Sequence, residues 1–273
     1  MAQVDAVVSD PQVSQIVRLV HERSGISLHA GKMPLVVARV QQRLAALSLD
    51  SYGDYVSYVA RDESGGEVVA LLDAIAATHT YFYREALHFS VLANQVASEW
   101  GSERTPLDIW CAAASTGEEA YTIAMTLAGL EPPVDFKIMA SDISTRALET
   151  AHAGVYRTEG VAVLPPDMMR AYCEKGLGES AGLVRVRKAI RDRVEYRRLN
   201  LLEVDHLDRQ FDVIFCRNVM IYFNRAVQQR VVTMLERHLR PGGFLFVSHS
   251  ETLDGFAHGL RSIAPAVYQA QVV

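Results

Sequence analysis

The chain has 273 residues, of which 49% are hydrophobic and 22% charged, and its formal net charge at pH 7 is -5. These values are ordinary for a globular protein with a sizeable core, and the negative balance argues against a nucleic-acid partner. The three cysteines are too widely spaced to form a redox or metal-binding pair. No signal peptide or apolar run of about 20 residues is present, so we expect a cytoplasmic protein without membrane insertion.

The first 77 residues are predicted to form a small all-helical domain. Apolar residues recur at helical spacing in four segments, residues 12–23, 34–47, 51–60 and 67–77. Arg39 and Arg43 in the second segment are four residues apart, so they share one face of a helix. Such a face can attract an acidic partner through its charge, or it can simply be solvated.

Residues 109–120, IWCAAASTGEEA, have the pattern of a strand, a tight turn and the start of a helix. Small side chains and Gly117 let a ligand approach the backbone closely. The loop lacks the lysine and the glycine pattern of phosphate-binding loops, and Glu118 and Glu119 would repel a pyrophosphate. The loop therefore favours a positively charged ligand without phosphate, such as S-adenosylmethionine. The alternative is an ordinary turn whose carboxylates complement the helix dipole.

Three later strands end in polar residues. The strand of residues 136–142 closes with Asp142, where a carboxylate in nucleotide-binding folds accepts hydrogen bonds from ribose hydroxyls. A role as helix N-cap is the alternative for this residue. Asn200 ends another strand and offers an amide that can read an adenine edge. The buried strand FDVIFC precedes Arg217 and Asn218. Because strands and helices alternate, we predict a doubly wound α/β sheet.

An inserted antiparallel β-subdomain is predicted at about residues 155–198. Glycines such as Gly178 mark tight loops, LVRVRK alternates apolar and basic side chains, and residues 194–196 begin the expected return strand. An exposed edge of this sheet can pair with an extended peptide, whose carboxylates Arg185 and Arg187 would bind. The alternative is a structural hairpin with a basic, solvated face.

The segments CAAASTGEEAYTIAM, ASDIS, NLLE, CRNVMIYF and GGFLFVSHSETL resemble, in order, the CheR family of chemotaxis receptor methyltransferases. The segment THTYFYRE, residues 78–85, is similar to the Asn-x-Thr-x-Phe-Phe-Arg signature of that family. The resemblance covers nearly the whole chain, to about Leu253. It implies a Rossmann-like class I methyltransferase sheet in a catalytic domain of residues 78–273. It also implies that residues 1–77 form a receptor-docking domain.

The resemblance further implies which residues form the active site. Arg84 and Tyr222 would lie at the reaction centre, with Arg84 beside the carboxylate end of the cofactor. Thr78 stands where the family pattern has Asn, and its hydroxyl lacks the second donor of an amide. The implied cofactor-binding residues are Thr78, Thr80, Arg84, Glu119, Asp142, Asn200, Leu201, Arg217 and Asn218.

The implied reaction is methylation of glutamate carboxylates on the cytoplasmic helices of chemoreceptors, in chemotaxis or a related receptor-array pathway. S-adenosylmethionine would be converted to S-adenosylhomocysteine. A carboxylate is already ionised at neutral pH, so we expect no catalytic triad and no metal. Arg39 and Arg43 would dock the receptor helices. Gly178, Arg185 and Arg187 would bind a receptor C-terminal pentapeptide.

Two other interpretations stay open from the residues alone. One is a methyltransferase of the same fold that acts on another substrate, and the second is a catalytically silent scaffold that binds the cofactor. The chain lacks the glycine-rich first loop of small-molecule enzymes and the basic groove or Asn-Pro-Pro-aromatic motif of nucleic-acid enzymes. We expect a monomer.

Overall fold

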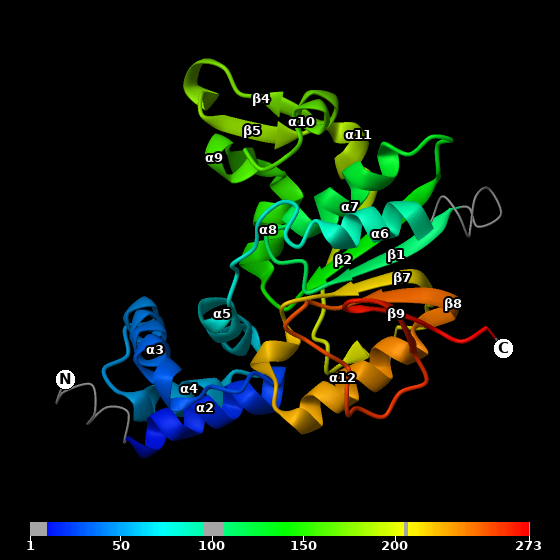
Figure 1. The fold of residues 1–273 in the computed structure, drawn as a ribbon. Helices are drawn as coiled ribbons and strands as arrows, with labels where there is room; N and C mark the ends of the chain where they lie inside the picture. The colour runs from blue at the N-terminus through cyan, green and yellow to red at the C-terminus, as the bar shows by residue number, and fades with distance from the viewer. Residues whose placement is uncertain (1–9, 96–105, 205–206, 273) are drawn as a thin grey trace.

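The computed structural model describes residues 10–95, 106–204 and 207–272, and it places an all-helical unit beside an α/β unit (Figure 1). The first nine residues and residue 273 of the predicted domains lie outside the described residues. The helical unit contains α2 (Pro11–Ser24), the 3-10 turn η1 (Ala30–Lys32), α3 (Met33–Leu47), α4 (Tyr52–Arg61) and α5 (Gly66–Ile75). Apolar side chains at helical spacing, such as Ile16, Val40 and Leu71, form its core.

The α/β unit is built on a seven-stranded sheet. Its strands are β1 (Leu107–Ala112), β2 (Phe136–Asp142), β6 (Val194–Arg198), β7 (Phe211–Cys216), β8 (Leu239–Phe246), β9 (Arg261–Ala264) and β10 (Val267–Gln269). Their order is β6-β2-β1-β7-β8-β10-β9. The first five are mutually parallel, and β10 is antiparallel to both of its neighbours. The predicted doubly wound α/β sheet is confirmed.

Helices cover both faces of the sheet (Figure 1). Helices α6 (Leu87–Gln95) and α7 (Glu118–Ala128) pack on one face, and α12 (Arg225–Arg237) packs on the other. Helix α8 (Thr145–Ala153) contacts β2 and β6. Strand β1 is buried along its whole length because Ile109 and Trp110 point to opposite faces, each into its own apolar cluster. The described residues include no helix that is long and apolar enough to cross a bilayer.

A three-stranded antiparallel sheet is inserted after α8, as predicted. Its strands β3 (Val155–Arg157), β4 (Cys173–Lys175) and β5 (Leu183–Val186) have the order β3-β5-β4. Short helical segments connect them and lead back to the main sheet: α9 (Thr158–Val161), α10 (Pro166–Tyr172), η3 (Gly178–Ser180) and α11 (Lys188–Arg191).

One prediction about this insertion is wrong. Residues 194–196 do not return into the small sheet but belong to β6, which pairs in parallel with β2 at the edge of the main sheet. Edge strands carry charged side chains that discourage further pairing, and β6 carries Glu195, Arg197 and Arg198. Because Glu195 and Arg197 alternate with apolar side chains, the sequence of β6 has the pattern of a half-exposed antiparallel strand.

Candidate active site

A cavity of about 550 Å³ lies where β1, β2, β6 and β7 end, on the carboxyl side of the sheet. The strand order reverses at β1, and ligands of open α/β sheets bind at such a switch point. Every residue that the sequence suggested for catalysis or cofactor binding lines this cavity, namely Thr78, Thr80, Arg84, Glu119, Asp142, Asn200, Leu201, Arg217, Asn218 and Tyr222.

The loop after β1 is held in a strained conformation. Ala113 and Ser115 have positive φ angles of 62° and 51°, which side chains other than glycine rarely adopt. Tyr83, Glu85 and Asn218 also have positive φ angles and lie in the neighbouring segments. Such strain collects at functional sites, where the surrounding structure holds it in place. The backbone itself therefore marks this region as the site.

Gly117 allows helix α7 to begin close to α8. Its φ angle is 97°, and a Cβ atom there would lie 2.7 Å from the Cβ of Ala151. No larger residue fits without moving one of the two helices. Small residues in this loop are therefore required by the packing of the two helices as well as by the close approach of a ligand.

Asp142 presents an oriented carboxylate to the cavity. Its Oδ2 accepts a hydrogen bond of 2.8 Å from the Ser115 amide, and its Oδ1 accepts one of 2.9 Å from the Ser144 amide. Helix α8 is capped by Ser144, whose hydroxyl accepts from the Ala147 amide, so Asp142 is not the N-cap. Burial raises the pKa of Asp142. Each oxygen retains a lone pair that can accept a hydroxyl proton.

Glu119 is the second carboxylate of the cavity, and it is paired with a buried cation. Nη1 of Arg217 lies 2.7 Å from its Oε2. Nη2 of Arg217 donates to the Arg84 carbonyl oxygen at 2.6 Å and lies 3.1 Å from Oε2 of Glu85. Burial opposes the charge on Arg217, but Glu119 and Glu85 outweigh it, so the pKa of the guanidinium is raised. Arg217 therefore holds the segment around Arg84 against the first turn of α7.

Arg84 and Tyr222 lie on the cavity wall together with residues of the helical unit. Nη1 of Arg84 donates to the His79 carbonyl oxygen at 3.1 Å. Tyr222, in the 3-10 turn η5 (Met220–Tyr222), accepts a main-chain bond of 2.7 Å from Ser27. Nζ of Lys32 lies 4.4 Å from the centre of the Tyr222 ring. Two cations and a phenol thus share the cavity wall.

Lys32 and Arg39 reach this cavity from the helical unit. The sequence placed Arg39 on a basic helix face, but it did not assign Lys32 to the site. No sequence pattern connects residue 32 with strands that end more than 70 residues later, so only the docking of the two units brings them together. The isolated bridge between Ile26 and Phe223 is part of that docking.

Asn200 lines the cavity and is oriented by two main-chain bonds. Its Nδ2 donates to the Arg23 carbonyl oxygen at 2.6 Å, and its Oδ1 accepts from the Leu202 amide at 3.1 Å. The amide keeps a second N–H and a second oxygen lone pair, with which it can still bind an adenine edge. The neighbouring Leu201 offers an apolar surface for a flat ring.

Asn218 is likewise held by the protein. Its backbone amide donates to Glu251 at 2.7 Å, and its Nδ2 donates to the Ser248 hydroxyl at 2.7 Å. These bonds fix the left-handed turn that follows β7. The residue shapes the cavity floor through its backbone.

The two arginines proposed for docking differ in their surroundings. Arg43 forms a two-pronged ion pair with the buried Glu67, at 2.9 and 2.6 Å, and Glu67 also accepts a bond of 2.6 Å from the Tyr55 hydroxyl. Within the described residues, Arg39 donates a hydrogen bond of 3.1 Å to Gln42 and forms no ion pair, and it lines the cavity. Arg43 therefore stabilises the helical unit, whereas the charge of Arg39 stays available to a ligand or partner at the cavity.

The arginines of the inserted sheet are not on its edge. Arg185 lies in β5, which is the central strand and pairs with both β3 and β4. Arg187 follows β5 and donates to the Cys173 carbonyl oxygen at 3.2 Å. The alternation of apolar and basic residues does not distinguish a central strand from an edge strand, so only the structure places Arg185 in the middle of the sheet. The edges of the sheet are β3 and β4. Gly178 lies on the connection between β4 and β5 with a φ angle of 58°.

A doubly wound sheet with an acidic, close-fitting loop after β1 and a carboxylate at the end of β2 suits a ligand that carries an ammonium and a sulfonium group. Asp142 and Glu119 line the cavity, and no lysine follows the loop. These features define an S-adenosylmethionine-dependent methyltransferase. The family model described as CheR methyltransferase, SAM binding domain, matches residues 78–268, and the CheR methyltransferase all-alpha domain matches residues 11–76. The chain belongs to the CheR family.

Relatives from several bacteria agree with this assignment. The chain is 39% identical to a chemotaxis protein methyltransferase of Salmonella typhimurium, over 95% of this chain and 90% of the relative. It is 40% identical to that of Escherichia coli, over 90% and 86% of the two chains. It is also 40% identical to chemotaxis protein methyltransferase 2 of Pseudomonas aeruginosa, over 93% and 91%.

Proposed function

We propose that this chain methylates glutamate side chains on the cytoplasmic helices of chemoreceptors, within the cytoplasm. The observation that carries the proposal is the composition of the cavity wall. Lys32 and Arg39 of the helical unit line the same cavity as Arg84 of the catalytic unit. Cations at the rim of a site attract and orient an anionic substrate. A glutamate on an acidic helix is such a substrate, and the relatives are named as chemotaxis methyltransferases.

The protein does not need a general base for this reaction. S-adenosylmethionine, when bound, supplies a methyl group on a positively charged sulfur. A substrate carboxylate is ionised at neutral pH, so no side chain needs to remove a proton from it. Arg84 would bind the substrate carboxylate or that of the cofactor, and Lys32 and Tyr222 would close the approach from the side of the helical unit. Fixing the attacking oxygen in line with the methyl group supplies much of the rate.

For the cofactor, we propose that Asp142 binds the ribose hydroxyls and Glu119 faces the ammonium group. Leu201 would lie against the adenine, together with Leu199, which also lines the cavity. Thr78 and Thr80 would add hydroxyl contacts. Arg217 would act through Glu119, because its guanidinium is already bound to protein groups.

Receptor membranes and S-adenosylmethionine labelled on the methyl group test the main proposal. We expect label on the receptor that is released as methanol by mild base, which is the behaviour of a carboxylate ester. The Asp142→Ala variant and membranes without receptor are the controls. Label in a small-molecule fraction would indicate another substrate. Intact cofactor binding without any transfer would indicate a silent scaffold.

For the receptor C-terminal pentapeptide, we propose binding along an edge strand of the inserted sheet, β3 or β4. Main-chain pairing would supply the affinity, and Arg185 and Arg187 beside the edge would favour carboxylates. Fluorescence titration with an acidic-aromatic pentapeptide tests this. We expect Arg187→Glu to abolish saturable binding, whereas Arg261→Glu on the remote strand β9 leaves it unchanged. Equal binding by the two variants would contradict the proposal.

A further inference from the structure

The loop that follows β8, residues 248–251, contacts both segments that carry the residues proposed for the reaction centre. We call it the β8 loop. Arg84 is followed directly by Glu85, and Tyr222 ends the turn of residues 217–222 after β7. The four residues of the β8 loop do not line the cofactor cavity. The loop can therefore influence the reaction centre only through the segments that it binds.

Glu251 binds main-chain amides near both ends of the turn that leads to Tyr222. Its Oε2 accepts a hydrogen bond of 2.7 Å from the Asn218 amide and one of 3.0 Å from the Ser248 amide. Its Oε1 accepts one of 3.2 Å from the Ile221 amide. Glu251 is 5% exposed. Burial raises the pKa of Glu251, and the bonds from main-chain amides act in the opposite direction.

These bonds make Glu251 necessary for the shape of the turn. A buried carboxylate is costly unless hydrogen bonds compensate it, and the amides that supply those bonds are constrained in turn. Asn218 has a φ angle of 57°, which residues other than glycine rarely adopt. A carboxylate bound to the amides of residues 218 and 221 holds that conformation across the turn. The direction of Tyr222, one residue later, follows from it.

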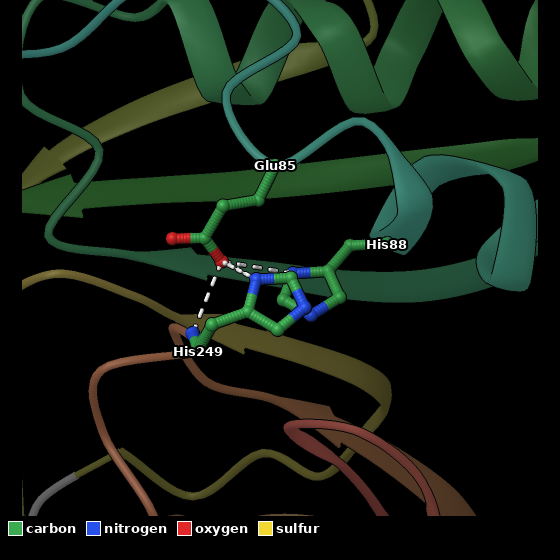
Figure 2. Close-up of side chains that lie close together, drawn as sticks. All are labelled: Glu85, His88 and His249. Atoms are coloured by element: carbon green, nitrogen blue, oxygen red, sulfur yellow. Dashed lines mark hydrogen bonds and ion pairs between the residues drawn. The ribbon is translucent and has the colours of Figure 1, made fainter.

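Figure 2 shows the second contact, in which the Glu85 carboxylate lies beside His249 of the β8 loop. Its Oε2 accepts a bond of 3.2 Å from the His249 amide and lies 3.0 Å from Nδ1 of the same residue. The His249 ring stacks on the buried ring of His88, with centroids 4.6 Å apart. Glu85 has a φ angle of 58°. The contacts of its side chain thus hold a strained backbone next to Arg84.

Ser248 joins the two contacts. Its hydroxyl donates to Oε1 of Glu85 at 2.8 Å and accepts from Nδ2 of Asn218 at 2.7 Å. One oxygen therefore connects the segment of Arg84 with the turn that leads to Tyr222. A shift of either segment must change the bond to the other.

We propose that the β8 loop is a positioning element of the reaction centre, in which Glu251 sets the direction of Tyr222 and the bonds from the loop to Glu85 hold Arg84. The inference rests on the proposed reaction at Arg84 and Tyr222. Methyl transfer depends on alignment, and a misplacement of about 1 Å can cost about 100-fold in rate. A loosened loop should therefore lower turnover more than cofactor affinity.

Glu251→Gln tests the proposal, because a glutamine side chain has only one acceptor oxygen. We expect kcat for methyl transfer to receptor membranes to fall about 10- to 100-fold, whereas the KM for S-adenosylmethionine changes far less. Glu236→Gln is the matched control and should transfer methyl groups as the wild type does. Glu236 also accepts a main-chain bond, of 2.7 Å from Gly259, but it lies on α12 and does not line the cavity. Ser248→Ala, which removes one hydroxyl, is a milder variant for which we expect the same direction of change.

Combining Glu251→Gln with Tyr222→Phe shows whether Glu251 acts through Tyr222. If it does, the double variant should be no slower than the slower single variant, because the phenol is already misplaced. Independent effects would instead add. Melting curves of all variants separate a loss of alignment from a loss of folding.

Hydrogen exchange measures the bonds of Glu251 without any activity. The amides of Asn218 and Ile221 should exchange faster in Glu251→Gln than in the wild type, whereas the amide of Ile214 in β7 keeps its protection. Unchanged exchange, or wild-type kcat in a folded Glu251→Gln variant, would overturn this inference alone. Additive effects in the double variant would overturn it as well. No methyl transfer to the receptor by the wild type would overturn the proposed function, and this inference with it.

Discussion

Arg217 lies 2.7 Å from Glu119 and connects the strand end of β7 with the first turn of helix α7. The same guanidinium binds the carbonyl oxygen of Arg84, so one buried cation sets the relative positions of three cavity segments. Its side chain is 0% exposed, and Glu119, Glu85 and the Arg84 carbonyl oxygen compensate its charge. The geometry of the proposed reaction centre therefore depends on a residue that need not touch the cofactor.

Replacing Arg217 by methionine should destabilise the fold. Glu119 and Glu85 would lose their shared cation, and breaking a buried ion pair costs about 3–5 kcal/mol. Urea unfolding measures this loss. Combining Arg217→Met with Glu119→Gln should restore part of the stability, with a coupling energy of about 0.5–3 kcal/mol. Purely additive effects of the two substitutions would mean that the pair is energetically silent.

Replacing Asp142 by alanine should weaken S-adenosylhomocysteine binding by roughly 2–4 kcal/mol. Two hydrogen bonds to a charged acceptor are lost, at about 1.5–3 kcal/mol each, and water compensates for part of the loss. Calorimetric titration measures the affinity. Glu149→Ala on the exposed side of α8 is the control and should bind as the wild type does. Wild-type affinity in a folded Asp142→Ala variant would exclude the ribose role.

Cofactor binding should also weaken as the pH falls. Burial raises the pKa of Asp142 above 3.8, and Asp73 on α5 adds to the shift, so the folded pocket takes up a proton at a higher pH than the unfolded chain. Protonation removes the negative charge that the ribose hydroxyls would bind, whereas an α-amino group with a pKa of about 8 stays charged in this range. Affinity should therefore be full above the raised pKa and decrease as the pH falls through it. Asp142→Asn should flatten this part of the profile, and an unchanged slope would contradict the assignment.

Arg84→Ala should lower turnover more than stability. The half-buried side chain donates to the His79 carbonyl oxygen and lies over the Tyr81 ring, so its loss leaves no buried charge without a partner in the described part of the chain. A contact to the reacting carboxylate would be lost, and we expect kcat/KM to fall at least about tenfold, which equals about 1.4 kcal/mol. Arg146→Ala, on the exposed surface of α8, is the matched control. Full activity of the Arg84 variant would remove this residue from the reaction centre.

We expect Arg39 to act in receptor docking and Arg43 to act in the stability of the helical unit. Arg43→Ala leaves the buried Glu67 without its cation and should cost about 3 kcal/mol of unfolding free energy. Arg39→Ala changes a partly exposed side chain and should alter stability by less than about 0.5 kcal/mol. Thermal melts and receptor methylation rates, measured on both variants, should therefore give opposite rankings. The same ranking in both measurements would contradict the division.

The sequence by itself determined the chain order of strands and helices, the helical unit before them, and the residues at the strand ends. These features depend on local patterns, because a fully buried run such as β1 is recognisable from its neighbours. Because parallel strands end at one side of a sheet, the polar residues after them, Asp142 and Arg217 among them, line one cavity.

Only the tertiary structure decided which partners those residues have. It placed β6 in the main sheet, buried Arg217 between two carboxylates, paired Arg43 with Glu67, and brought Lys32 to Tyr222. The physical reason is that ion pairs and cation–π contacts act over a few ångströms, whereas these paired side chains are 24 to 190 positions apart in the sequence. Local patterns carry no information on such distances, so the packing of the units determines them.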